Sequence, residues 1–439
     1  MKVLLVALNA RYVHTNLAIR CLSAALEEDK CRNVRTGRNI KIREFTINDQ
    51  LDRIAGEIYE EKPDVIGFSC YIWNIAATLV LIRRLRCVLP KTKIIVGGPE
   101  VAYDGEKILA ENLEIDVVIL GEGEITLPKI INTWEEGEDL DNVEGIVWRG
   151  KNGRIVTGEL SPVLPDLDDF PDPYQNDEDF KGRLVYVETS RGCPFSCQYC
   201  ISSTIRGLRF LNPEKFRVRL IKLFENGART IKFVDRTFNT HKKHAFAILD
   251  IFKEEVLRYC EINEKYDCDE GFRAHCEMAG ELLDDDWIKY LSNYPEGLIQ
   301  LEIGVQSTHA PTLEIINRSQ HFEQWKGKVY KLQHNCNIPI HLDLIAGLPE
   351  EGWEEFACSF NDVYSVRPNQ LQLGFLKVLK GSGIWKNCAE YGLVYSPDAP
   401  YVILKTKEIN HDEMLGLHKV EDIVEKYYNS GRFTNSLEY

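Results

Sequence analysis

The stretch RGCPFSCQYC, residues 191–200, brings Cys193, Cys197 and Cys200 within eight residues of one another. Thiolates are ligands for soft metals, and a structural zinc ion usually takes four protein ligands in two pairs. Here the spacing is C-x3-C-x2-C, and no fourth cysteine or histidine follows nearby. Iron–sulfur clusters are also held by thiolates, and three cysteines on a four-iron cluster leave one iron open. The loop therefore indicates a metal site that is one protein ligand short.

Three interpretations of these cysteines are compatible with the loop alone. They are small core side chains, zinc ligands completed by a distant residue such as His241 or Cys260, or ligands of an iron–sulfur cluster. In the third interpretation, Gly192 and Pro194 let the chain fold tightly around the cluster, and Tyr199 lies against whatever binds the open iron. We favour the cluster because of the residues that surround the loop.

Around the loop, apolar strand patterns alternate with helical patterns. Six such units within about 200 residues predict a partial parallel (β/α)6 barrel. The predicted strands cover 184–190, 230–235, 271–277, 299–305, 339–347 and 371–379, and the predicted helices cover 213–226, 242–259, 282–293, 311–318, 322–334 and 351–365.

Each of these strands ends in polar residues. The chemistry of a parallel barrel takes place at the carboxyl ends of its strands, so we expect a polar mouth above an apolar barrel, built around the cysteine loop. The residues are Asp235, Arg236, Asn239, His275, Glu277, Gln306, Asp343, Glu350, Lys377 and Lys380.

The first part of the chain repeats a strand–helix unit five times. This alternation predicts a doubly wound parallel sheet, whose ligand sits past the carboxyl ends of the strands near the switch in strand order. The strands are expected near 2–9, 43–47, 64–72, 93–98 and 115–121. The loops at the binding edge are 9–15, 69–74, 97–103 and 121–124.

Between the two α/β regions lie a predicted hairpin around Asn152-Gly153 and an acidic, proline-rich segment, 161–180, which is expected to be a solvated connector. The residues after 382 are expected to form a short helical appendage with one helix at 411–428. The predicted domains are 1–142, 143–182, 183–381 and 382–439.

Composition narrows the class of protein. The chain has 439 residues and a formal net charge of −15, which disfavours general nucleic-acid or anionic-membrane binding. MKVLLVAL resembles the start of a signal peptide, but Asn9 and Arg11 interrupt it, and no apolar run is long enough to cross a bilayer. We expect a cytoplasmic protein with no membrane partner, in which a tight cysteine cluster points to metal or catalysis rather than disulfides.

The segment CPFSCQYC resembles the C-x3-C-x-aromatic-C loop of the radical SAM superfamily. The resemblance implies a [4Fe–4S] cluster on Cys193, Cys197 and Cys200, with S-adenosylmethionine (SAM) on the open iron. It further implies that the reduced cluster cleaves SAM to a 5′-deoxyadenosyl radical, which abstracts a hydrogen atom from the substrate.

Two further stretches are similar to motifs of this family that lie near the adenine of SAM. By resemblance, Tyr199 backs the adenine. The segment DLIAGLPE (343–350) is similar to the fifth-strand motif G-x-I-x-G-x-x-E, although Asp343 replaces the first glycine. The matching residues are Ile345, Gly347 and Glu350.

The fourth-strand and third-strand residues are assigned in the same way. IGVQS (303–307) with Arg318 resembles the segment near the ribose and carboxylate of SAM, which implies contacts from Gln306 and Arg318. Glu277 stands where related enzymes place a carboxylate near the methionine moiety. The Gly-Gly-Glu that follows the second strand in the family is replaced by FVDRTFN (233–239), which leaves the contacts to the amino group unassigned.

Residues 1–140 resemble the cobalamin-binding domain that precedes the barrel in many radical SAM enzymes, most clearly over 96–109 and 117–131. The first loop lacks the D-x-H-x-x-G motif that supplies a lower-ligand histidine, so His14 is expected to be an ordinary loop residue. The residues expected to approach a flat ligand are Ser69, Gly97, Gly98, Gly121 and Gly123, although these glycines fit tight strand–helix turns equally well.

Together the resemblances imply a cobalamin-dependent radical SAM methylase. Methylcobalamin would methylate an unactivated carbon of an unknown substrate, a small molecule or a peptide, and a flavodoxin or ferredoxin would donate electrons. The alternatives are a cobalamin-dependent rearrangement or cyclisation, and a non-catalytic iron–sulfur or cobalamin-binding protein. A tRNA methylthiotransferase is disfavoured by the acidic charge.

Overall fold

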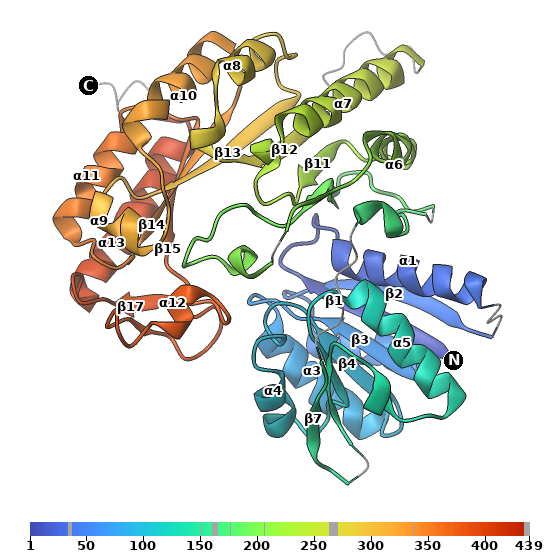
Figure 1. Cartoon of the computed structure of the whole chain (residues 1–439). Helices are drawn as coiled ribbons and strands as arrows, with labels where there is room; N and C mark the ends of the chain where they lie inside the picture. The colour runs from blue at the N-terminus through green and yellow to red at the C-terminus, as the bar shows by residue number, and fades with distance from the viewer. Residues whose placement is uncertain are drawn as a thin grey trace. The chain divides into compact units, whose positions relative to one another are not determined.

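The computed structural model describes residues 1–33, 37–150, 152–159, 166–175, 177–205, 207–262, 271–336 and 338–433. The chain divides into two compact units (Figure 1). Unit 1 comprises Met1–Tyr186 with Glu225–Ala228, and unit 2 comprises Val187–Phe224 with Arg229–Tyr439. Each has a sheet of its own, and strand β8 (Leu184–Val187) of the unit 2 sheet spans the boundary between the two units in the sequence.

Unit 1 is a doubly wound sheet of seven strands in the order β2-β1-β3-β4-β5-β6-β7. The first five strands are parallel, and β6 and β7 continue the sheet as an antiparallel hairpin. The strands are β1 Lys2–Asn9, β2 Asn39–Thr46, β3 Val65–Ser69, β4 Lys93–Gly97, β5 Val117–Ile119, β6 Ile146–Arg149 and β7 Ile155–Thr157. The helices are α1 Leu17–Arg32, α2 Leu51–Glu61, α3 Ile75–Val88, α4 Gly105–Glu111 and α5 Gly123–Glu136, with single turns η1 Leu140–Asn142 and η2 Leu167–Asp169.

The core of unit 1 follows from its buried strands. Strand β3 is buried at every residue, as expected for a parallel sheet with helices on both faces. Helices α1 and α5 pack together on one face, where Ile19, Leu26 and Ile130 join the core formed by the strands. The strand order reverses between β1 and β3, so the loops that follow these two strands flank the switch point.

The connection after the hairpin differs from the predicted solvated connector in its described part. Leu167, Tyr174 and Phe180 are buried, and the Tyr174 hydroxyl donates to the carbonyl of Tyr186. The segment 166–175 therefore packs within unit 1. Its acidic and proline-rich composition predicted exposure, but its apolar side chains are buried. The predicted hairpin is also part of the unit 1 sheet rather than of a linker. The predicted residues 161–165 and 176 lie outside the described residues.

Unit 2 is built on a six-stranded sheet in the order β15-β14-β13-β12-β11-β8, which is sequence order. Its strands are β8 Leu184–Val187, β11 Thr230–Phe233, β12 Arg273–Met278, β13 Ile299–Gln306, β14 Ile340–Ala346 and β15 Gln370–Phe375, with short pairs β9 Ser190–Arg191 with β10 Arg209–Phe210 and β16 Val394–Tyr395 with β17 Ile403–Lys405. The helices are α6 Pro213–Glu225, α7 Lys242–Ile262, α8 Asp285–Leu291, α9 Ala310–Ile315, α10 Phe322–Cys336, α11 Trp353–Tyr364, α12 Gly383–Lys386 and α13 His411–Ile423. Single turns are η3 Ile201–Thr204, η4 Phe238–Thr240 and η5 Gly280–Leu282, and η6 Val424–Asn429 is a π-helix. The partial parallel barrel predicted from the sequence is confirmed.

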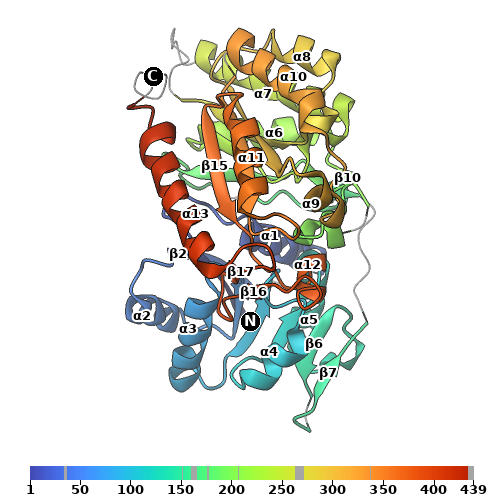
Figure 2. The ribbon, with the colours of Figure 1, turned by 90° about the vertical axis from the view of Figure 1, so that its left-hand side faces the viewer.

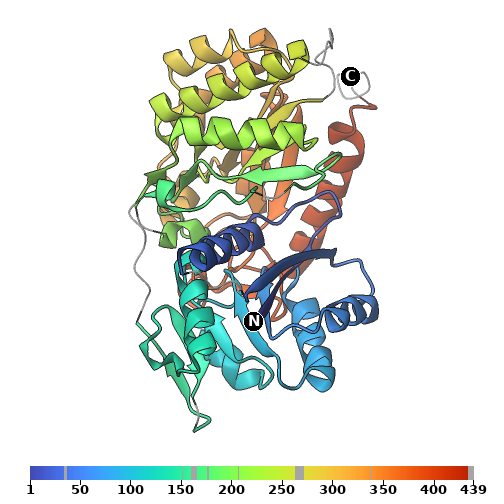
Figure 3. The same ribbon diagram turned by 90° about the vertical axis from the view of Figure 1, so that its right-hand side faces the viewer.

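The two faces of this sheet differ in character. Residues alternate between buried and half-buried along β13 and β14, and the buried ones are apolar. The helices lie outside the curved sheet (Figures 1 and 3), so the apolar face packs against them. The inner face carries Lys232, His275, Glu277, Glu302, His341 and Asp343. The predicted apolar barrel is therefore wrong: a closed eight-stranded barrel fills its interior with side chains, whereas this open sheet leaves its inner face accessible.

The residues after 382 form the helical C-terminal end of unit 2. Figure 2 shows α13 lying along β15 and α11. At the end of η6, the Asn429 side chain pairs with the backbone of Leu371, accepting from its N–H at 2.9 Å and donating to its carbonyl at 3.0 Å. This element covers the exposed edge of the sheet, which is why it packs rather than extends into solvent. Among the described residues, no helix is both long and apolar enough to cross a membrane.

Candidate functional site

The cysteine loop leaves the carboxyl end of β8 and is closed by the antiparallel pair β9–β10. Gly192 has φ 104°, and a Cβ built on it would lie 2.0 Å from the carbonyl oxygen of Gly207, so only glycine fits there. Cys193, Cys197 and Cys200 are free cysteines. The tight fold predicted for this loop is present, and it brings the three thiols into one short turn structure.

Arg318 joins this loop to the fourth strand of the sheet. Its Nη1 lies 3.7 Å from the sulfur of Cys197 and 3.1 Å from the hydroxyl of Tyr199, and its Nη2 donates to the carbonyl of Gly304 at 2.6 Å. Burial raises the pKa of Tyr199, so its phenol stays protonated. A guanidinium beside Cys197 stabilises negative charge on that sulfur.

Backbone bonds hold the loop from two further directions. Gln198 donates its N–H to the carbonyl of Ile316 at 2.9 Å and accepts from the N–H of Ile384 at 2.8 Å. Residue 383 must be small, because a Cβ there would meet the Gln198 side chain. Neither Gln198 nor Ile384 was predicted as a site residue, because contacts between segments so distant in sequence leave no local signal.

Two residues expected to face the substrate instead hold the site together. Asp235 is 1% exposed and accepts hydrogen bonds from the N–H and hydroxyl of Thr189 and from the hydroxyl of Ser190. Burial raises the pKa of Asp235 to about 7, although these three hydrogen bonds lower it. Asn239 is also buried and pairs with both backbone groups of Ala279, at 2.9 and 2.8 Å. For these two, the predicted place in the mouth is corrected to a supporting role.

The third and fourth strands carry the other predicted SAM contacts. Glu277 lies 3.7 Å from Lys232, which also pairs with Glu302 at 3.0 Å. Burial raises the pKa of Glu277, and Lys232 opposes that shift. Gln306 takes a positive φ of 70°, at a bulge in the pairing of β13 with β14, and its side chain folds back over Gly304. Glu277, Gln306 and Arg318 therefore all lie on unit 2 at strand ends or just beyond them.

The residues of the predicted fifth-strand motif lie in different environments. Ile345 lies on the inner face of β14. Gly347 packs so closely that a Cβ would lie 2.7 Å from Ile403. Glu350, however, is exposed, with φ 60°, and the buried acid of the motif is its neighbour, Glu351. The chain turns at Glu350 and directs the next residue inward.

Glu351 holds the turn that follows β13. Its carboxylate accepts from the hydroxyls of Ser307 and Ser359 at 2.5 and 2.9 Å. Burial raises the pKa of Glu351 to about 7, against the lowering effect of the two hydroxyls. The sequence did not predict Glu351 as a site residue, because the family motif aligns with Glu350, one residue earlier.

The last two predicted mouth residues lie away from the inner face. Lys377 is exposed, and its backbone pairs with Val402 as an isolated bridge. Lys380 lies with its ammonium 5.6 Å from the ring centre of Tyr401. Both belong to the junction between β15 and the C-terminal segment.

In unit 1, the loops at the switch point form a polar network. The Asn16 side chain caps α1 and lies 3.4 Å from the hydroxyl of Ser69, and the Asn74 amide donates to the carbonyls of Leu8 and Ser69. Beside it, Tyr71 and Trp73 stack with their ring centres 4.4 Å apart, and Trp73 is 44% exposed. The edge predicted to meet a flat ligand therefore presents a flat aromatic surface.

The four glycines predicted to approach that ligand serve different purposes. A Cβ on Gly98 would lie 2.6 Å from the carbonyl oxygen of Cys70, and one on Gly123 would lie 2.8 Å from Leu22. These two are explained by packing within unit 1. A Cβ on Gly97 would make an ordinary contact with Ile119, whereas one on Gly121 would meet nothing within 4 Å. Gly121 has φ 71°, so the turn conformation by itself accounts for a glycine there.

The ring of His14 packs edge-on against that of Tyr186, with the ring centres 5.8 Å apart, and its carbonyl accepts hydrogen bonds from Asn9 and Arg183.

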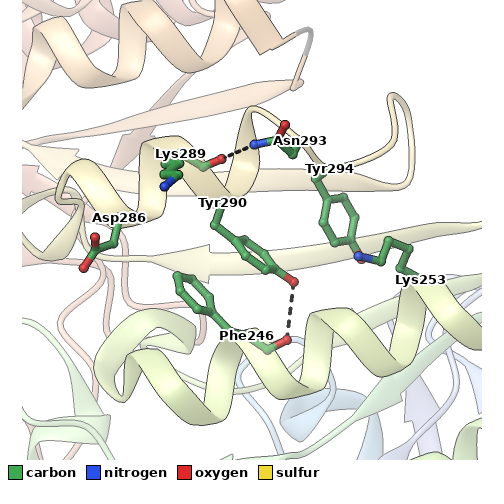
Figure 4. A pocket seen from close by; sticks show the side chains of 7 residues that line it. All are labelled: Phe246, Lys253, Asp286, Lys289, Tyr290, Asn293 and Tyr294. Atoms are coloured by element: carbon green, nitrogen blue, oxygen red, sulfur yellow. Dashed lines mark hydrogen bonds between the residues drawn. The ribbon is translucent and has the colours of Figure 1, made fainter.

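A cavity of about 430 Å³ lies between α7 and α8, on the outer side of unit 2 (Figure 4). Its lining is Phe246, Lys253, Asp286, Lys289, Tyr290, Asn293 and Tyr294. The hydroxyls of Tyr290 and Tyr294 already donate to backbone carbonyls of α7. The cavity is separate from the cysteine loop and offers few free polar groups.

The three cysteines of the loop are suitable thiolate ligands for an iron–sulfur cluster. In the described part of the chain, no group of three or more histidines, cysteines or acids converges on a point as ligands of a single ion do. The cysteines of a four-iron cluster each bind a different iron, so they need no common point. Arg318 beside Cys197 and the Thr237 hydroxyl 3.4 Å from Cys193 suit sulfur ligands that carry negative charge.

Comparison with known families divides the chain as the fold does. Residues 3–131 match the B12 binding domain, and residues 187–363 match the Radical SAM superfamily. Residues 389–439 match a family described as a protein of unknown function, DUF4080.

Individual relatives agree with these matches. The chain is 29% identical over 234 residues to an "Uncharacterized methyltransferase" of Pyrococcus horikoshii, covering 51% of each protein. It is 24% identical over 308 residues to "Cobalamin-dependent radical SAM methyltransferase TokK" of Streptomyces tokunonensis, covering 67% of this chain and 44% of that protein. The chain spans about half the length of the curated relatives it matches.

Among solved structures, the chain resembles the radical S-adenosylmethionine methyltransferase TsrM of Kitasatospora setae. The TM-score is 0.70 at 16% identity, over 92% of this chain and 80% of that one. At this identity the likeness concerns the fold alone.

Proposed function

We propose that this chain, a member of the radical SAM superfamily with a B12 binding domain ahead of its barrel, is a cobalamin-dependent radical SAM methyltransferase. The observation that carries the proposal is the cysteine loop at the end of β8, closed tightly by Gly192 and backed by Arg318. The methyltransferases among its relatives support the class of reaction. The methyl acceptor is proposed to be an unactivated carbon of a small molecule.

In unit 2, Cys193, Cys197 and Cys200 would hold a [4Fe–4S] cluster, which supplies the electron that cleaves SAM to methionine and a 5′-deoxyadenosyl radical. Arg318 orients Tyr199 and lowers the cost of negative charge at Cys197. The proposed SAM contacts are Tyr199, Glu277, Gln306, Arg318, Ile345 and Gly347. Their shared feature is a position at, or just past, the carboxyl ends of the strands.

In unit 1, the switch point between β1 and β3 is the proposed cobalamin site. Cobalamin would supply the methyl group, and a second SAM would replace it. Gly121 and the stacked Tyr71 and Trp73 suit a large planar ligand. Ser69 lies at the same edge and is held by Asn16.

An electron donor of the flavodoxin or ferredoxin class would reduce the cluster. Such clusters are damaged by oxygen, so the proposed setting is an anaerobic or microaerobic cytoplasm.

SAM cleavage tests the enzyme half of the proposal. Reduced, cluster-loaded protein should convert SAM to 5′-deoxyadenosine, and Cys197→Ala should lose both the cluster absorbance and this product. Cys358→Ala is the matched control, because Cys358 is an exposed free cysteine on α11. An intact cluster that yields no 5′-deoxyadenosine would show a binding protein rather than an enzyme.

Cobalamin retention tests the other half. Protein purified anaerobically with hydroxocobalamin should keep about one corrin per chain, measured by its visible absorbance. Retention of none contradicts the proposed site in unit 1. Incubation with methyl-labelled SAM then separates methyl transfer from rearrangement or cyclisation, since only the first places the label in a product other than methionine and methylcobalamin.

A further inference from the structure

Several polar side chains share the inner face of the unit 2 sheet. We call Lys232, His275, Glu277, Glu302, His341 and Asp343 the inner-face cluster. Strand register brings them together: Lys232 pairs with His275, Glu277 with Glu302, and Glu302 with His341. Asp343 is the partner of Gly304, one step further along β14.

The cluster holds three carboxyls and one lysine. Lys232 is shared between Glu302 at 3.0 Å and Glu277 at 3.7 Å. The lysine and the two glutamates keep 25–29% of their side-chain surface exposed, so a small molecule can reach them. Asp343 is the third carboxyl, and Lys232 makes no ion pair with it within 4.0 Å among the described residues.

Asp343 is a member of the cluster with an unsatisfied hydrogen-bond acceptor. Its Oδ1 is fully buried and has no hydrogen-bond partner among the described residues. Burial raises the pKa of Asp343 to about 8, and the charges of Glu302 and Glu277 raise it further than Lys232 can lower it. A buried carboxyl oxygen without a partner is costly, so a ligand that donates a hydrogen bond there gains the most.

The two histidines add acceptors rather than charge. Burial lowers the pKa of His275 to about 4 and also lowers that of His341, and in both cases Lys232 lowers it further. Both rings are therefore neutral near pH 7. Within the described part of the chain, His341 Nε2 is buried and has no hydrogen-bond partner, so this nitrogen is also unsatisfied.

We propose that the inner-face cluster binds an ammonium or guanidinium group of a small-molecule substrate, with Glu302, His341 and Asp343 as its specificity-determining residues. This rests on the proposed function, because it describes the molecule that the radical reaches. Glu302 and Asp343 accept hydrogen bonds from the cation, and His341 Nε2 completes the set. A cation beside Asp343 favours the ionised form of that carboxyl, which accepts hydrogen bonds, whereas an anionic group would be repelled by the carboxylate of Glu302.

Binding of defined probes tests the assignment. Cluster-loaded protein is titrated anaerobically with agmatine, with butyrate and with 1-butanol, and heat release is measured. Agmatine should bind saturably, and the two analogues should not. Glu302→Gln and Asp343→Asn, which keep the shape of each side chain, should each weaken agmatine binding by about tenfold or more.

Gln372→Asn is the matched control. Gln372 is the register partner of Asp343 on β15 and carries no charge, so its variant should keep the wild-type dissociation constant within about twofold. Equal binding of butyrate and agmatine, or unchanged agmatine binding in both acidic-residue variants, overturns the proposal.

A peptide arm identifies the source of the cation. The capped tripeptide acetyl-Gly-Arg-Gly-amide presents the same guanidinium on a backbone. Binding weaker than that of agmatine supports a small molecule, whereas clearly tighter binding overturns that part of the proposal in favour of a peptide side chain.

The test of the cation site can be distinguished from the test of the proposed function. Formation of 5′-deoxyadenosine is measured on the same wild-type protein without any probe. Cleavage of SAM without agmatine binding contradicts only the proposed cation site. Agmatine binding without cleavage of SAM contradicts only the proposed enzymatic function.

Discussion

Single residues decide whether the cysteine loop can form. Gly192→Ala places a methyl group against the carbonyl of Gly207, in a backbone conformation that L-residues rarely adopt. We expect a loss of about 2 kcal/mol or more in the free energy of unfolding, together with a fall in iron bound per chain. Chemical denaturation and iron analysis measure the two effects.

Gly207→Ala is the control for this substitution. Gly207 has φ 82°, but a Cβ there meets nothing within 4 Å. It should cost only the backbone strain of about 1 kcal/mol and keep its iron. Equal losses of iron in both variants would show that strain, and not the contact with Gly207, shapes the loop.

The carboxyl of Asp343 makes stability depend on pH. Its pKa is raised to about 8 in the folded protein, while an unfolded aspartate titrates near the ordinary pKa of 3.8. The unfolded state therefore loses its proton first, so wild-type stability falls as pH rises from about 4 through 8. Asp343→Asn cannot titrate, and its stability relative to wild type should rise over that range.

Urea denaturation at pH 5 and pH 8 measures this difference. Gln372→Asn, which changes an uncharged neighbour, should show the same offset from wild type at both values. A constant offset for Asp343→Asn as well would mean that the carboxyl is already ionised at pH 5.

At the scale of the element, the C-terminal helix completes the barrel sheet. Strand β15 is the edge of the sheet, and the Asn429 amide at the end of η6 pairs with both backbone groups of Leu371. A π-helix is rare, and here its wider turn places a side chain where another strand would pair. The C-terminal segment thus protects an edge that would otherwise be open.

Asn429→Ala removes both of these hydrogen bonds. We expect a loss of about 1–3 kcal/mol in the free energy of unfolding and faster amide hydrogen exchange at Leu371. Ser430→Ala is the control, because that exposed hydroxyl bonds only the local backbone at Lys426 and Arg432 and should change stability by less than about 0.5 kcal/mol. Unchanged exchange at Leu371 in Asn429→Ala would refute the edge-capping role.

The whole molecule consists of two units with separate cores. Units of this kind usually unfold in separate steps, so calorimetry should resolve two transitions. Hydroxocobalamin at about a hundred times its dissociation constant should raise one of them by about 5–10 °C, because a ligand stabilises the unit that binds it. The cobalamin-free protein is the reference. A single transition that moves as one would show that the units do not unfold independently.

Local pattern was enough to predict most of the fold. The strand–helix alternation placed all five parallel strands of unit 1 and all six of unit 2, because hydrophobic periodicity reports which face of each element is buried. The cysteine spacing and the small residue at 192 are likewise local. A further signal was present but not used: IQLEIGVQ (299–306) and IHLDLIA (340–346) alternate apolar and polar residues, which is typical of a sheet with one polar face.

What the sequence by itself determined is therefore the order and type of the elements and the loop that can carry a metal centre. Only the tertiary structure decided that Asp235 supports the strand end, that Glu351 rather than Glu350 is buried, and that Asn429 completes the sheet edge. The physical reason is that a strand's alternation depends on its own residues, whereas hydrogen bonds across many residues depend on register and packing. Those arise only when the elements assemble.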